Sequence, residues 1–199
     1  MSIPVYTLSL REYMAFKDTE DRYSAFENYL QYGGFPVIGI SRFDTRSAWQ
    51  IVDDIYTAVV TRDISRRHRI RNKALFDRVV RFIIENVGKT FSANSIVKLL
   101  KGEKRSLSVE TIYNYLKWLQ EAFIIYPCQR YDLQGKAVLK TQEKYYLSDI
   151  SLKYGQLGFD NKMIAAMLEN IVFLEMKRRG YEVYILHAGG EAAVDRIAR

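Results

Sequence analysis

The pattern of residues 74–149 restricts the fold more than any other part of the chain. Apolar side chains recur there at helical spacing in three stretches and then fill two short runs rich in isoleucine and tyrosine. The expected elements are, in order, a helix at 74–87, a short helix capped by Ser92, a helix capped by Ser108, and strands at 124–126 and 144–147. This order is typical of a winged helix-turn-helix, although many small α+β modules share it.

The residues before this block predict helices with a sharp break between them. A helix is expected over 8–31, where Ser9 and Glu12 have the spacing of a capping box. The run Gly33-Gly34-Phe35-Pro36 interrupts the pattern, because it combines two permissive residues with a fixed proline φ. A second helix is expected from about 45 to 64.

The last block predicts one long helix followed by a hairpin. The helix is expected from about 161 to 179 and ends at Gly180, and strands are expected at 181–186 and 193–198. A helix and a hairpin do not make a complete domain, because the sheet would need a third strand. The predicted fold class is therefore mostly α with a small β part (α+β).

Several functional classes are excluded by what the sequence lacks. There is no uninterrupted apolar stretch of about 18 residues and no secretory signal, so no membrane partner is expected. The single cysteine, Cys128, rules out an internal disulfide and favours a reducing, cytoplasmic setting. No P-loop, zinc-ligand spacing or Gly-x-Ser-x-Gly elbow is present.

The positive charge of the chain is concentrated in one block. The chain has 30 Lys and Arg against 23 Asp and Glu, a net charge of +7. Residues 62–105 hold 13 basic and 4 acidic side chains, net +9, whereas residues 1–61 hold 5 and 8, net −3. Such a block attracts phosphates. The candidate nucleic-acid contacts are Arg62, Arg66, Arg67, Arg69, Arg71 and Lys73 in one run, and Lys101, Lys104 and Arg105 in a polar turn. A solvated connector with no specific partner explains the run equally well.

The third helix of the 74–149 block offers Thr111, Asn114 and Lys117 on its exposed face. Asparagine pairs with adenine, and lysine reaches guanine or phosphate. However, Glu110 and Glu121 leave this helix with a net charge of −1, which favours phosphate contacts over base readout. In the alternative interpretation, the module packs against another domain and never contacts DNA.

Three carboxylates of the last block are candidate metal ligands: Glu169, Glu175 and Asp195. On a helical wheel Glu175 falls within the apolar face, where an unpaired carboxylate is costly, and Glu169 lies off that face. Asp195 lies in an apolar strand. A partly exposed helix end and an edge strand explain the same residues without a metal.

Five stretches together carry a family resemblance. They are Tyr32-Gly33-Gly34-Phe35-Pro36, Asp63-Ile64, the 74–149 block, Lys144-Tyr145-Tyr146-Leu147-Ser148-Asp149 and Glu169-Asn170-Ile171-Val172-Phe173-Leu174-Glu175. In this order they resemble the C-terminal half of prokaryotic AAA-type ATPases that carry the domain of unknown function numbered 4143. The resemblance covers nearly the whole chain.

The resemblance implies a piece of a longer protein. A P-loop ATPase core that binds ATP would precede residues 8–16, residues 74–149 would be a winged helix, and the last block would begin a PD-(D/E)xK nuclease-like fold. In such a fold Glu169 and Asp195 would hold Mg²⁺ and activate water. We follow the resemblance in preferring Glu169 over Glu175.

The sequence departs from that family pattern in its last residues. Ala193-Val194-Asp195-Arg196 stands where the family has Glu-Val-Asp followed by an apolar residue, and no Glu-x-Lys strand follows. We therefore expect a helical linker region at 1–73, a winged helix at 74–149 and an incomplete nuclease-like segment at 150–199. No cofactor is expected in this chain itself.

Three functional hypotheses follow. The first is a non-catalytic, nucleic-acid-associated accessory region of a AAA-type ATPase. The second is a divalent-metal nuclease module that is incomplete here. The third is an interaction module whose basic segment docks on the protein's own ATPase domain or on an acidic partner, and packing of that segment on the acidic residues 1–61 would favour it.

Overall fold

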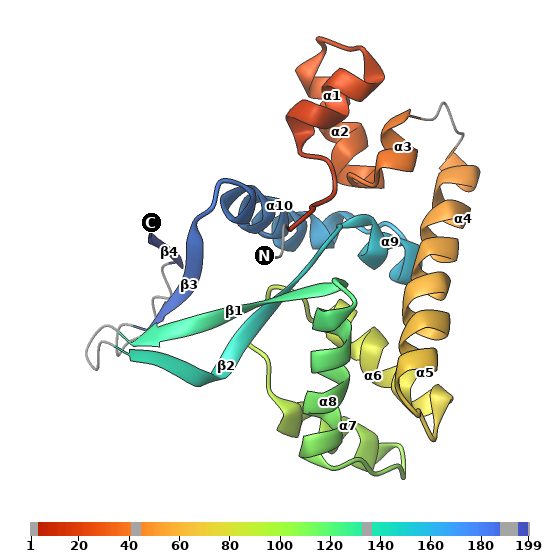
Figure 1. Ribbon diagram of the computed structural model, residues 1–199, viewed down its shortest axis with the longest axis vertical. Coiled ribbons are helices and arrows are strands. Elements are labelled where there is room, and N and C mark those ends of the chain that lie inside the picture. The colour runs from red at the N-terminus through yellow and green to blue at the C-terminus, as the bar shows by residue number, and fades with distance from the viewer. Residues whose placement is uncertain (1–3, 41–44, 133–136, 188–194, 199) are drawn as a thin grey trace.

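The computed structural model describes residues 4–40, 45–132, 137–187 and 195–198, and at 45, 61, 139–141, 161, 186, 187 and 195–198 it describes the backbone alone. The predicted fold class is confirmed: the described chain is mostly helical, with one small sheet. Helices α1–α3 lie at one end, α6–α8 at the opposite end, α4 and α5 along one side, and the sheet projects from the other side (Figure 1).

The first predicted helix is two helices in the structure, α1 (Leu10–Lys17) and α2 (Arg22–Tyr32). The predicted capping box of Ser9 and Glu12 is present at the start of α1. The helix then stops at Asp18, which has a left-handed φ of 50°. Asp21 starts α2 by accepting hydrogen bonds from the backbone of its first turn. The prediction of one continuous helix was wrong, because these aspartates favour a helix end and a helix start.

The break at Gly33 is confirmed, and a long helical column follows it. The short helix α3 (Pro36–Ile40) begins at the proline of the break. The column then comprises α4 (Thr45–Tyr56), a π-helical segment η1 (Thr57–Asp63) and α5 (Ile64–Arg67). Sequence periodicity predicted its extent to within a few residues but not the wider π-helical turns, which are often found at functional sites.

The block that most restricted the fold has the predicted order. Its helices are α6 (Lys73–Glu85), α7 (Ala93–Gly102) and α8 (Val109–Glu121), followed by the antiparallel strands β1 (Ile125–Asp132) and β2 (Ala137–Leu147). Ser108 caps α8 as predicted, whereas the Ser92 side chain makes no capping hydrogen bond to α7. An isolated bridge between Thr90 and Lys144 joins the α6–α7 connection to β2.

The last block completes the sheet by pairing with the preceding one. It contains α9 (Ser151–Leu157), the 3₁₀ turn η2 (Asn161–Met163), α10 (Ile164–Arg178), β3 (Glu182–His187) and β4 (Asp195–Ala198). The strand order is β2-β1-β3-β4, with β1 and β3 parallel and the outer pairs antiparallel. The third strand that the terminal hairpin needed is thus β1, and the sheet crosses the expected boundary at residue 150.

One large apolar core holds these elements together. It takes buried side chains from the column, from α6–α8 and from α9, among them Val60, Val79, Leu116 and Leu152, each at most 1% exposed. A smaller cluster of Cys128, Tyr146, Phe173, Leu174 and Ile185 lies between α10 and the sheet. No helix of the described residues is long and apolar enough to cross a membrane.

Candidate functional site

The basic run of residues 62–73 is anchored by apolar side chains that leave its cations exposed. Ile64 is buried in the core and Ile70 packs against it. Between and beyond these anchors the arginines at 62, 66, 67, 69 and 71, together with Lys73, are exposed. Arg67 forms an ion pair with Asp63 at 2.9 Å. The other five cations of the run form no ion pair within the described residues.

His68 fixes the middle of this run on α8. Its ring stacks on Trp118 with centroids 4.3 Å apart and planes only 8° from parallel. Its Nε2 lies 3.7 Å from a carboxylate oxygen of Glu121. Where the chain is described, no ion pair joins residues 62–73 to an acidic side chain of residues 1–61. The ion pairs that docking of the basic segment on those acidic residues would form are therefore not observed in the described residues.

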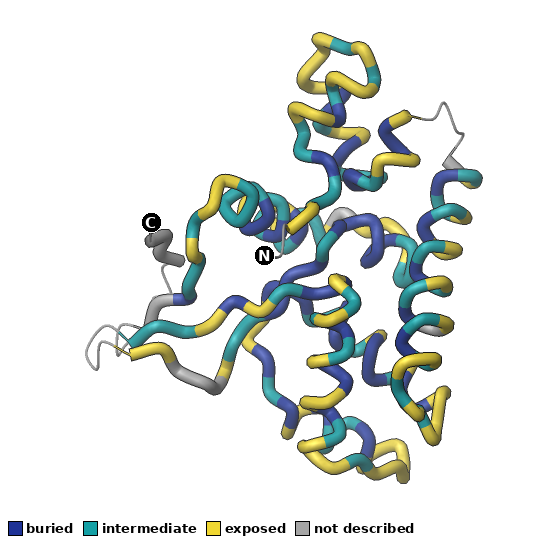
Figure 2. The backbone as a smooth tube through the Cα atoms, viewed as in Figure 1, coloured by how far each residue is buried: buried dark blue, intermediate teal, exposed yellow. Residues whose placement is uncertain are grey.

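The second basic tract, the α7–α8 turn, lies beside the start of α6. Lys101, Lys104 and Arg105 are exposed there. The turn is tied to α6 by Arg78, whose Nε and Nη2 donate to one oxygen of Glu103 at 3.0 and 2.5 Å. Both tracts lie at the end of the molecule far from α1–α3, and both form exposed surface (Figure 2).

The outward face of α8 differs in part from the expectation. Thr111 is half-buried, and its hydroxyl lies 2.9 Å from that of the capping Ser108, so it belongs to the helix start. Asn114 and Lys117 are exposed as predicted, and the Lys117 ammonium lies 3.8 Å from Glu121. Tyr113, which the sequence pattern did not indicate, is 42% exposed on the same face.

The predicted metal ligand Glu169 has basic and hydroxyl partners. Its Oε1 accepts hydrogen bonds from the Lys144 ammonium at 2.7 Å and from the Tyr146 hydroxyl at 2.5 Å. Asp195 begins β4 opposite Ile185, and its side chain lies outside the described residues. Among the described residues no group of three or more His, Cys, Asp or Glu side chains could hold a metal ion. Glu169 therefore connects α10 to β2 through its hydrogen bonds with Lys144 and Tyr146.

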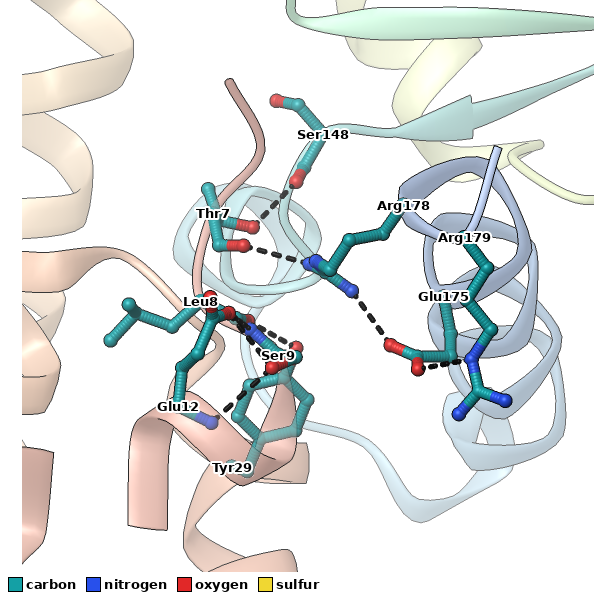
Figure 3. Close-up of polar contacts among 9 residues, drawn as sticks. All are labelled: Thr7, Leu8, Ser9, Glu12, Tyr29, Ser148, Glu175, Arg178 and Arg179. Carbon is teal, nitrogen blue, oxygen red and sulfur yellow. Dashed lines mark hydrogen bonds and ion pairs between the residues drawn. The ribbon is translucent and has the colours of Figure 1, made fainter. Parts of the chain in front are cut away.

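Glu175, the carboxylate on the apolar face, is paired rather than isolated. It accepts hydrogen bonds from Arg178 at 3.0 Å and Arg179 at 2.8 Å (Figure 3). Burial raises the pKa of Glu175, but the hydrogen bonds from Arg179 and Arg178 lower it more, and the net pKa lies below the ordinary value. Two arginines three and four residues further along the same helix thus compensate the cost of burying the Glu175 carboxylate.

Arg178 also holds the chain before α1, which we call the strap (residues 4–9). Its Nη2 donates to the carbonyl oxygen of Thr7 at 2.7 Å, and the Thr7 hydroxyl donates to the carbonyl oxygen of Ser148 at 3.0 Å (Figure 3). Tyr29 of α2 donates to the carbonyl oxygen of Leu8 at 2.8 Å. The strap is thereby connected both to α10 and to the segment that follows β2.

Asp149, which sequence reasoning did not single out, is the most deeply placed charged group of these contacts. It is 2% exposed and accepts hydrogen bonds from the Gly34 N–H at 2.8 Å and from the Ser151 hydroxyl at 2.6 Å. Burial raises the pKa of the Asp149 carboxyl, although these hydrogen bonds oppose the rise. Aspartate side chains often accept a hydrogen bond from the backbone two residues further on. The spacing of Asp149 and Ser151 was therefore a sequence signal for the local turn, but not for the contact with Gly34.

Asn170, next to Glu169, is fully buried. Its Oδ1 accepts a hydrogen bond from the Leu147 N–H at 2.7 Å, and its Nδ2 donates one to the Leu147 carbonyl oxygen at 2.9 Å. Three of the five stretches that carry the family resemblance therefore contact one another: Gly34 bonds to Asp149, and Glu169 and Asn170 bond to β2. Their shared role in the structure is to join the N-terminal helices, the hairpin and α10.

Comparisons with known proteins identify relatives without a described activity. The model of a domain of unknown function, DUF8612, matches residues 23–163, a span that ends before α10. An uncharacterized protein of Haemophilus influenzae is 34% identical over 187 residues, which is 92% of this chain and 46% of that protein. An uncharacterized protein of Methanocaldococcus jannaschii is 28% identical over 188 residues, 89% of this chain and 42% of that protein. The chain thus spans less than half the length of these relatives, and no solved structure matches it.

Proposed function

The chain belongs to the family of the domain of unknown function DUF8612, and from this premise we propose that it is a nucleic-acid-binding accessory region of a longer, cytoplasmic AAA-type ATPase, without catalytic activity of its own. One observation carries the proposal: the run 62–73 and the α7–α8 turn present their cations at the same end of the fold. Of the nine basic residues predicted to contact nucleic acid there, only Arg67 is neutralised by an ion pair within the described residues.

The arrangement of α6–α8 and the hairpin supports a winged-helix interpretation of this end. The Thr90–Lys144 bridge, a single residue pair, joins the α6–α7 connection to the hairpin and so ties the helices to it. In this fold the exposed face of α8 would approach the duplex, with the basic turn at its N-terminal end facing phosphates.

Phosphate contacts, not base readout, are the expected mode of binding. Thr111 is engaged at the helix start, and Glu121 lies close to both Lys117 and His68. Of the three side chains predicted to contact bases, Asn114 is then the one without a partner among the described residues, and one amide is too little for sequence specificity. Binding should therefore depend strongly on salt and weakly on sequence.

The ATPase part of the proposal rests on the resemblance and on the length of the relatives. The chain lacks a P-loop, so ATP hydrolysis needs a core outside it. Because the relatives are more than twice as long as the matched region, they have room for such a core. We do not propose nuclease activity, since the described partners of Glu169 account for its position without a metal.

The test is a salt titration of duplex DNA binding by fluorescence anisotropy. Each arginine–phosphate contact contributes about 0.9 to the slope of log K against log salt concentration. The triple variant Arg66→Ala, Arg69→Ala, Arg71→Ala should therefore flatten the slope by roughly 3. The matched control, Arg11→Ala, Arg22→Ala, Arg46→Ala, removes the same charge from exposed positions on α1, α2 and α4. A flat slope for the parent chain, or equal losses in both variants, would overturn the proposal.

A further inference from the structure

An open groove beside α6 concentrates three guanidinium groups. It has a volume of about 540 Å³, within the range of small-molecule sites. Arg78 and Arg81 contribute from α6 and Arg105 from the α7–α8 turn, while Tyr56 closes it from the end of α4. Asp77 and Glu85 of α6 also line the groove, so its three arginines outnumber its carboxylates by one.

Two of these guanidiniums are held in place by carboxylates: Glu103 is not part of the groove lining, whereas Glu85 is. Arg78 is fixed by Glu103, and the Arg81 Nε donates to Glu85 at 3.2 Å. Among the described residues the terminal amino groups of Arg81 have no other hydrogen-bond partner, and Arg105 has no ion pair. Oriented guanidiniums with unused N–H groups bind tetrahedral oxyanions well, because a guanidinium offers a planar fork of donors.

We propose that this groove is a binding site for the phosphate group of a nucleotide-sized ligand. Arg81 and Arg105 donate to the phosphate oxygens, and the rest of the volume accommodates the remainder of the ligand. A lone phosphate would leave most of the groove empty. The phosphate could belong to a free nucleotide or to the end of a nucleic-acid strand, and both present the same chemistry to the arginines.

Asp77 gives the inference a test of opposite sign. Asp77 lines the same groove as the three arginines, and burial raises the pKa of its carboxyl. An ionised carboxylate there repels a phosphate and limits its affinity. Replacing it with asparagine removes the repulsion while keeping the size of the side chain, so Asp77→Asn should bind phosphate more tightly and Arg105→Gln less tightly.

The experiment is isothermal titration calorimetry of the 199-residue chain with three probes. They are inorganic pyrophosphate, ATP, and a single-stranded oligonucleotide with or without a 5′-phosphate. Loss of charge-assisted hydrogen bonds should weaken pyrophosphate binding about tenfold or more in Arg105→Gln. The matched control, Arg46→Gln, removes an exposed arginine on α4 and should bind like the parent chain.

The outcomes separate the two ligand sources and the two proposals. Tighter binding of ATP points to a free nucleotide, and a preference for the 5′-phosphorylated strand points to a nucleic-acid end. Absence of binding by every phosphate probe at millimolar concentration, or equal binding by Arg105→Gln and Arg46→Gln, would overturn the groove. Duplex DNA binding in that case would leave the proposed function intact, whereas phosphate binding without duplex binding would overturn only the proposed function.

Discussion

Replacement of Gly33 by alanine probes the contact that joins the N-terminal helices to the rest of the fold. Gly33 ends α2 with φ +76° and ψ −165°, and an added Cβ would lie 1.9 Å from an oxygen of Asp149. Gly158 ends α9 with φ +80° and ψ 160°, and an added Cβ would meet nothing within 4 Å. The two glycines thus have nearly the same backbone conformation but opposite surroundings.

The difference between the two alanine variants isolates the cost of displacing Asp149. Alanine in this backbone conformation costs about 1–3 kcal/mol at either position. At Gly33 the carboxylate must also move away from its donors, Gly34 and Ser151, and hydrogen bonds to charged groups contribute about 1.5–3 kcal/mol each. Gly33→Ala should therefore lower the free energy of unfolding by about 3 kcal/mol or more beyond Gly158→Ala. That is a large part of a typical total of about 5–15 kcal/mol.

Urea unfolding followed by far-UV circular dichroism measures both values. Near-UV spectra of the two variants before unfolding check that each retains its tertiary packing. Equal losses of stability would refute the reasoning, because they would mean that the backbone conformation alone sets the cost and that Asp149 moves freely.

Three further predictions concern α10. Asn170→Ala should lower the free energy of unfolding by about 2–4 kcal/mol, because it leaves two buried backbone groups of β2 unpaired, whereas Asn94→Ala on the exposed side of α7 should change it by less than about 0.5 kcal/mol. A double-mutant cycle of Glu169→Gln and Lys144→Met should give a coupling free energy near 1 kcal/mol. A coupling of zero would contradict the contact. Added Mg²⁺ should not change the unfolding midpoint of the parent chain. Because the pKa of Glu175 is lowered in the fold, its ion pairs stabilise the fold at pH 7. This contribution falls as the pH drops below the ordinary value of 4.5 and is lost below the lowered pKa, so the stability difference between the parent and Glu175→Gln should shrink over that range. A stability difference that does not change as the pH is lowered through this range would show that it does not come from the ionised form.

Signals that act within a few residues predicted most of the helices. Ser9 and Ser108 cap helices as expected, and the Gly33 break falls at the end of α2. The interruption at Asp18 was missed because apolar periodicity continues across it on both sides. Aspartate caps, which act through single hydrogen bonds, set those two helix ends instead.

Long-range pairing was beyond what periodicity can specify. The parallel pairing of β1 with β3 places Arg130 opposite Ile185, and the sequence of neither strand indicates which strand it pairs with. The site residues show the same limit. The exposure of the basic run followed from its charge, but the partners of Glu169 and Glu175 depend on which face of α10 the fold buries.

The contact between Thr7 and Arg178 has a consequence for the order in which the chain folds during synthesis. The two residues are 171 positions apart, and the strap contacts Ser148 and Arg178 only after both have been made. At about 5–20 residues per second, a ribosome needs roughly 10–30 s to travel from one to the other. Until Ser148 and Asp149 have been made, α1 and α2 lack the contacts that join them to the rest of this region, and the hydrogen bond from Arg178 forms later still. The helices α1 and α2 are therefore among the last parts of this region to reach their final place.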